Sequence, residues 1–226
     1  MSSSRASRRD ELCSRSGSRF ISTALAIAVL TWSSAGDADG TQPALAAGPY
    51  AVLQGVLRKT LLKVEVARVQ IRVDEATQRK LAALASGREH SDTLAAGLVA
   101  AVMNTRHAVI TSEIRRDVPF DRYAESAYSD LDSARESGMI SESAYWSLAR
   151  LLPEWMRMLQ DRGARKGDRF MCQLHPGSMR VVYRTADGVT MVDRTIPGGD
   201  PGRAVLASYL APESSFRKEL VRSLFR

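Results

Sequence analysis

The chain has 226 residues, of which 44% are hydrophobic and 25% are charged, and its formal net charge is +7. These values are typical of a globular protein with one domain and a short additional segment. Residues 1–35 hold five arginines against two acids, so they supply +3 of this charge and leave +4 for the rest. The sequence has no long Lys/Arg block and no basic stripe interleaved with aromatics, which argues against nucleic acid as a partner.

The first part of the chain has the pattern of an export signal. An Arg-rich start precedes an apolar run at 20–32, and Ser33-Ser34-Ala35 supplies small residues for cleavage. That run is shorter than the roughly 20 apolar residues that span a bilayer. We therefore expect a signal peptide at 1–35, a Gly/Ala/Asp-rich linker at 36–49 and an exported domain at 50–226, periplasmic or secreted, with no stable membrane span after cleavage. An uncleaved anchor and a disordered cytoplasmic tail are the alternatives.

Two strands and two helices are expected next. Strands are predicted at 50–57 and 61–73, and in the second one the apolar face changes near Ala67, which indicates a bulge or packing on different sides. Asp74 is a natural N-cap for a helix over 75–85. Ser91 or Asp92 can cap another over 93–103.

The middle of the chain predicts a strand at 105–116, a helix at 120–136 and a helix at 141–162 that Pro153 interrupts. Four apolar side chains should form the core face of the last of these helices: Trp146, Leu151, Trp155 and Leu159.

Residues 166–226 predict a three-stranded meander followed by two helices. The turns at 175–178 and 186–188 separate strands at 170–174, 179–183 and 189–195. Asp200 is the expected N-cap of a helix over 202–210, and the last helix should begin at Ser214 or Ser215. Helices collected between early strands and a late antiparallel meander indicate an α+β domain, with helices layered on one face of a curved antiparallel sheet.

Cofactor and metal chemistry have little support in the sequence. His90, His107 and His175 are scattered, with no carboxylate or thiol at ligand spacing, and no phosphate-binding or dinucleotide fingerprint occurs. Of the two cysteines, Cys13 precedes the apolar run and would be lost on cleavage. Cys172 should be a small buried residue in a strand. We expect neither a metal nor a cofactor.

The order of these signals resembles the chalcone isomerase-like family. The resemblance rests on Lys166-Gly167-Asp168-Arg169, the Pro176-Gly177 turn, Asp187-Gly188, Pro197-Gly198 with Asp200, the helix through Tyr209-Leu210, the closing helix at 216–225, and residues 53–73. It covers most of 53–225 and implies an open-faced sandwich.

The resemblance also implies positions for a binding site. Arg58 falls on the Arg that stabilises negative charge in plant enzymes of the family, and Tyr123 falls on the family's Tyr. Glu65 stands where the family has its catalytic Thr, while Ser126 and Asp130 stand at its Lys and Asn positions. A carboxylate at Glu65 can pair with Arg58 and compete with an anionic ligand.

Three functions follow from this resemblance. The first is an exported, non-catalytic or divergent domain that binds a small amphipathic or apolar ligand, such as a fatty acid or a phenolic, with Arg58 holding its polar end. The second is an isomerase of the intramolecular lyase type, which would close a chalcone ring with Arg58 and Tyr123. The third is a ligand-free envelope interaction protein whose protein partner the sequence does not identify.

Overall fold

The computed structural model describes residues 52–59 and 64–225, all of which lie in the unit Gly40–Arg226. Within 52–59 and at residue 64, Leu53 is the one residue whose side chain is described. The predicted signal peptide and linker lie outside the described residues. No helix in the part of the chain that the structure describes is both long enough and apolar enough to cross a membrane.

The described strands form one six-stranded antiparallel sheet in which sequence neighbours are also spatial neighbours. They are β1 (Val52–Lys59), β2 (Val64–Val73), β3 (Ala108–Ile114), β4 (Arg169–His175), β5 (Ser178–Arg184) and β6 (Thr190–Pro197). Strands β4 to β6 confirm the predicted meander. Gly177 and Gly188, in the two turns that join them, have φ of 79° and 89°, a region that favours glycine.

The β1–β2 pair contains an irregularity at the predicted place. Leu57 pairs with Ala67 and Arg58 pairs with Glu65, so Val66 is an extra residue in β2. Beyond this point every second residue, from Ala67 to Val73, is buried. The change of apolar face in the sequence therefore marks a bulge.

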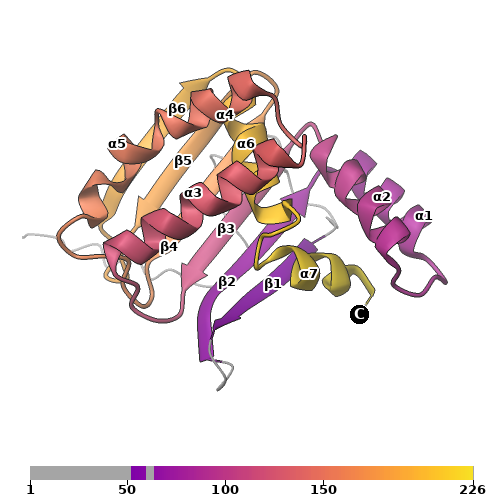
Figure 1. Cartoon of the computed structure of the whole chain (residues 1–226), viewed down its shortest axis with the longest axis horizontal. Coiled ribbons are helices and arrows are strands. Elements are labelled where there is room, and N and C mark those ends of the chain that lie inside the picture. The colour runs from indigo at the N-terminus through magenta and orange to yellow at the C-terminus, as the bar shows by residue number, and fades with distance from the viewer. Residues whose placement is uncertain (1–51, 60–63, 226) are drawn as a thin grey trace, which may run out of the picture. The chain divides into compact units, whose positions relative to one another are not determined.

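The helices gather on one face of the sheet (Figure 1), which confirms the α+β open-faced sandwich. They are α1 (Glu75–Ala85), α2 (Asp92–Met103), α3 (Phe120–Glu136), α4 (Glu142–Ala149), α5 (Leu152–Met156), α6 (Asp200–Leu210) and α7 (Arg217–Arg222), with 3₁₀ turns at Arg157–Leu159 and Ser223–Phe225.

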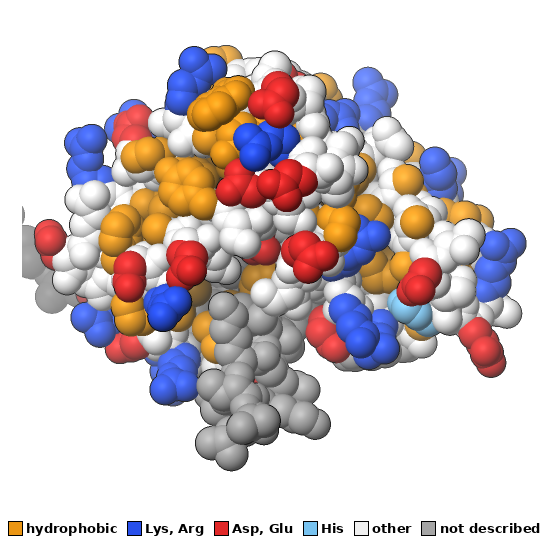
Figure 2. Space-filling view, in the orientation of Figure 1, with side chains coloured by type: hydrophobic (Ala, Val, Ile, Leu, Met, Phe, Trp, Pro, Cys, Tyr) orange, Lys and Arg blue, Asp and Glu red, His pale blue; other side chains and the backbone are white. Residues whose placement is uncertain are grey.

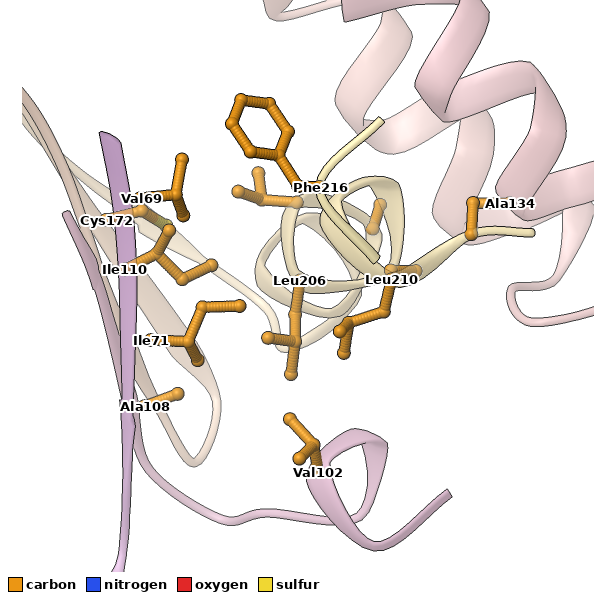
Figure 3. Packing of buried hydrophobic residues seen from close by; sticks show 14 of the residues in the cluster. Val69, Ile71, Val102, Ala108, Ile110, Ala134, Cys172, Leu206, Leu210 and Phe216 are labelled. Carbon is orange, nitrogen blue, oxygen red and sulfur yellow. The ribbon is translucent and has the colours of Figure 1, made fainter. Parts of the chain in front are cut away.

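Helix α6 forms the centre of the core. Its residues are buried nearly all round, with Asp200 and Arg203 as the exposed exceptions, as expected for a helix covered on several sides. Figure 3 shows Leu206 facing Ile71 and Ile110 of the sheet, while Ala134 of α3 lies on the far side of α6. Burial of each large apolar side chain here contributes about 1.5–3 kcal/mol. The helical layer is thus two helices deep at this point.

Several helix ends differ from the sequence prediction. Asp74 and Ser91 cap α1 and α2 as expected, their side chains accepting from the amides of Thr77 and Leu94. The N-cap of α6 is Gly199, because Asp200 is already helical, and the Asp200 carboxylate accepts from the Ser143 hydroxyl at 3.1 Å. The last helix begins at Arg217, three residues after the earlier of the two predicted starts.

The prediction for Trp146 was wrong. Its side chain is 52% exposed, whereas Tyr145 and Leu148 of the same helix are buried. The buried positions 145, 148, 152, 155 and 159 are spaced three or four residues apart, so they form one continuous face through α4, α5 and the 3₁₀ turn that follows. Trp146 lies five residues before Leu151, a spacing that places the two side chains on different faces of a helix. Figure 2 shows hydrophobic side chains exposed on the helical face of the molecule.

Candidate functional site

The resemblance placed two site residues at the end of β1 and the start of β2. Arg58 and Glu65 are cross-strand partners beside the bulge. The Arg58 side chain lies outside the described part, so its contact with a ligand stays a prediction. The Glu65 carboxylate is half-buried and lies 3.7 Å from the Arg68 guanidinium and 3.8 Å from that of Arg115. Arg115 also pairs with Glu113 at 2.8 Å, so the two carboxylates share this guanidinium.

The other three expected site residues lie on α3. Tyr123, Ser126 and Asp130 are three and four residues apart, which places them along one side of the helix, and all three are half-buried. The same helix buries Leu131 and Ala134 against the core. The row of polar side chains therefore follows the margin of the contact between α3 and the rest of the domain.

Tyr123 lies in an environment that keeps its hydroxyl protonated. Burial raises the pKa of Tyr123 to about 12, and the negative charge of Asp168 adds to this effect. A phenol with this pKa is neutral at physiological pH. It can donate a hydrogen bond to a ligand oxygen, but it does not serve as an anionic base.

A second tyrosine, Tyr209 of α6, joins this row from the layer beneath α3. Burial raises the pKa of Tyr209 well above its usual range, with smaller contributions from Tyr123, Cys172 and Asp130, while a hydrogen bond with Ser112 opposes the shift. These residues belong to two helices and two strands, and α3 packs directly against α6. We call Tyr123, Tyr209, Ser112, Asp130 and Cys172 the buried tyrosine cluster.

The sequence analysis missed Tyr209 and Ser112 as site residues, although each left a signal. Ser112 is the one hydroxyl among the inward positions 108, 110, 112 and 114 of β3, whose other members are Ala and Ile. Ser112 is 8% exposed, so a polar side chain at this position needs a partner. Tyr209 belongs to the stretch that carried the resemblance, but no role was inferred for it.

Asp168 forms a separate polar centre beside the cluster. Its fully buried carboxylate accepts two bonds from the Arg162 guanidinium, at 2.7 and 3.2 Å, and one from the Tyr183 hydroxyl at 2.8 Å. The amides of Arg165 and Ala186 donate to it at 2.9 and 3.1 Å. Burial works against its ionisation, but these donors hold the pKa of Asp168 below its ordinary value. With its oxygens engaged in this way, we assign Asp168 a structural role.

The buried tyrosine cluster offers protonated hydroxyls and one carboxylate next to an apolar wall. Cys172 belongs to that wall, since it is a fully buried free thiol and burial raises its pKa far above the ordinary range. Within residues 52–59 and 64–225, no three His, Cys, Asp or Glu side chains gather closely enough to hold a metal ion. The chemistry that the cluster supports is hydrogen bonding to a small molecule with polar and apolar parts.

No protein-family model matches this chain, and no curated protein matches its sequence.

Proposed function

We propose that this protein is an exported, chalcone isomerase-like domain that binds a small amphipathic ligand, a phenolic or a fatty acid, between α3 and the helix-covered face of the sheet. The observation that carries the proposal is the half-buried polar side of α3, which holds Tyr123 and Asp130 and packs against α6, the helix that holds Tyr209. Neutral phenols donate to a ligand oxygen, and Asp130 can accept from a ligand hydroxyl. These features support a ligand with its own hydroxyl or carboxyl group.

Arg58, near the end of β1, is the residue proposed to hold the anionic group of the ligand. A guanidinium there would hold a carboxylate or phenolate, the role that the family resemblance implies for it.

Binding is tested by native mass spectrometry and thermal shift on the purified protein, with a panel of fatty acids and hydroxylated phenolics. We expect one class to raise the melting temperature, and we expect Tyr123→Phe and Asp130→Asn to weaken its binding about tenfold, as for loss of one charged or buried hydrogen bond. Tyr128→Phe is the matched control, because Tyr128 is a half-buried tyrosine of the same helix that lies outside the cluster. Equal effects of the two Tyr→Phe variants, or no binding by either class, would overturn the proposal.

A parallel pair of variants tests the role of Arg58. Arg58→Ala should weaken binding of a fatty acid more than Lys59→Ala, which removes the neighbouring positive charge of the same strand. Turnover of a chalcone above the uncatalysed rate, lost in Arg58→Ala, would favour the isomerase over the binding protein.

Export is tested separately on cells that express the full chain with a C-terminal tag. We expect the tagged protein in the periplasmic or secreted fraction, with a mass that corresponds to loss of the first 35 residues. A full-length protein in the cytoplasm would contradict this part of the proposal.

A further inference from the structure

A hollow lies away from the buried tyrosine cluster. The β4–β5 turn, the connection from α2 to β3 and the start of α6 enclose a volume of about 160 Å³. Thr105, Arg106, His175, Ser178 and Arg203 contribute polar side chains, while Leu174 and Pro176 make part of the lining apolar. The volume exceeds that of several waters, so a small ligand fits.

Two arginines give the hollow its charge, and neither is paired with an acid of the described chain. The Arg106 side chain is exposed and makes no hydrogen bond or ion pair with the described residues. Arg203 donates through Nη1 to the Met103 carbonyl oxygen at 2.6 Å. Because a guanidinium has five N–H donors, that bond orients Arg203 and leaves most of its donors for another acceptor.

The Asp74 carboxylate is bound to the loop that carries Arg106. Asp74 accepts from the Thr105 hydroxyl and from the amides of Arg106 and His107, at 2.9, 2.9 and 3.2 Å. Its remaining oxygen accepts from the Thr77 amide at 2.8 Å. Asp74 therefore fixes the 105–107 backbone instead of neutralising the Arg106 guanidinium.

His175 supplies a further donor beside the arginines. Its ring meets the His107 ring edge to face, with centroids 5.8 Å apart. Burial, and then the charge of His107, lower the pKa of His175, so the ring is mostly neutral at physiological pH and carries one N–H. The positive charge of the hollow thus comes from the arginines, while the first turn of α6 carries Asp200, whose carboxylate accepts from the Ser143 hydroxyl.

We propose that this hollow binds a small oxyanion, a phosphate or a carboxylate, held by the guanidinium groups of Arg106 and Arg203 with the His175 ring and the start of α6 beside it. Guanidinium groups suit this chemistry, because their planar forks match the oxygens of both anions. The site stands apart from the proposed ligand between α3 and the sheet, and either can fail without the other.

The three histidines of the chain make the test specific. Inorganic phosphate and, separately, acetate are titrated into the full-length protein at constant ionic strength, and the imidazole ring signals are followed by NMR. We expect saturable shifts of the His175 and His107 signals with at least one of the two anions. His90 packs against Phe225 and does not line the hollow, so its signal should stay in place.

Charge-removal variants separate a site from general attraction. Arg106→Gln and Arg203→Gln should each weaken the apparent affinity about tenfold, as expected for loss of a charged hydrogen bond. Arg157→Gln removes an exposed positive charge elsewhere and should change the affinity less than twofold. Arg106→Gln should leave the fold intact, because the Arg106 side chain makes no hydrogen bond or ion pair with the described residues. No saturable shift with either anion, equal movement of all three histidines, or an Arg157→Gln effect as large as the Arg106→Gln effect would overturn the proposal.

Discussion

At the scale of single residues, Asp168 shows how one buried carboxylate links distant parts of the fold. It connects Arg162, ahead of β4, to Tyr183 in β5 and to the turn at Ala186. Removal of one partner from such a buried pair is costly, since the other charge is left without compensation. The Lys166-Gly167-Asp168-Arg169 stretch, noted in the sequence for its resemblance, therefore has a physical role in stability.

Replacement of Asp168 by Asn should lower the free energy of unfolding by roughly 3–5 kcal/mol at neutral pH, as for other broken buried pairs. Urea unfolding followed by circular dichroism measures this loss. Asp117→Asn is the control, because Asp117 pairs with Arg165 on the surface and is 57% exposed, so we expect a much smaller loss. Equal losses for the two variants would contradict the structural role of Asp168.

The stability difference between the parent protein and Asp168→Asn should depend on pH. The pKa of Asp168 is lower in the folded protein than its ordinary value of 3.8, so the stability it contributes is complete above that value. As the pH falls below about 4 and passes through the folded pKa, this contribution is lost. The difference in stability between the parent protein and Asp168→Asn should therefore shrink on acidification below pH 4, and a difference that stays constant would contradict the assignment.

At the scale of elements, helix ends and turns carry specific backbone chemistry. Asp74 caps α1 and also binds the backbone at the start of β3, whereas Ser91 only caps α2. These bonds lower the pKa of Asp74 to about 2 although its burial acts in the opposite direction. Asp74 therefore joins a helix to a strand 31 or more residues away in sequence.

For this reason Asp74→Ala should lower the free energy of unfolding more than Ser91→Ala does. Loss of an ordinary N-cap costs about 1 kcal/mol, which we expect for Ser91→Ala. Asp74→Ala also leaves the Arg106 and His107 amides without their acceptor and should cost about 1–3 kcal/mol more. Chemical unfolding of both variants makes the comparison, and equal costs would show that the bonds to the 105–107 backbone are not stabilising.

Two glycines with the same backbone conformation predict different tolerance to a side chain. Gly163 and Gly138 have φ of 66° and 69°. A Cβ at Gly163 would lie 2.5 Å from the Val118 carbonyl oxygen, whereas one at Gly138 meets nothing within 4 Å. Gly138→Ala should cost only the left-handed backbone penalty of about 1–2 kcal/mol. Gly163→Ala should cost clearly more, and thermal unfolding of the pair distinguishes conformational strain from the steric clash.

At the scale of the whole molecule, the sheet and α6 share one core. Cys172 lies in that core, fully buried at the centre of β4 beneath the helices (Figure 3). Its reaction with a thiol reagent therefore requires the helical layer to separate from the sheet.

Labelling of Cys172 should report global unfolding. In a Cys13→Ser background, which leaves Cys172 as the single thiol, we expect negligible labelling in buffer and a labelling rate that rises with urea in step with the loss of circular dichroism signal. Rapid labelling without denaturant would contradict the packing of α6 on β4.

The sequence by itself determined the elements of this protein and their order. The meander, the caps at Asp74 and Ser91, the glycine turns and the β2 bulge were all predictable, because each depends on contacts within a few residues or on strand alternation. Trp146 shows where this fails, since its apolar character suggested a core position, whereas the buried face of α4 runs through Tyr145 and Leu148.

Only the tertiary structure decided which side chains meet. Tyr209 reaches Tyr123 and Ser112 because α6 lies between α3 and the sheet, and Arg203 joins Arg106 across about a hundred residues of sequence. Such contacts between distant residues depend on how the helical layers pack on the sheet, and the hydrophobic periodicity of the sequence does not predict that packing. The resemblance pointed to Arg58 and the α3 row, while the packing of the central helix supplied the remaining members of the cluster.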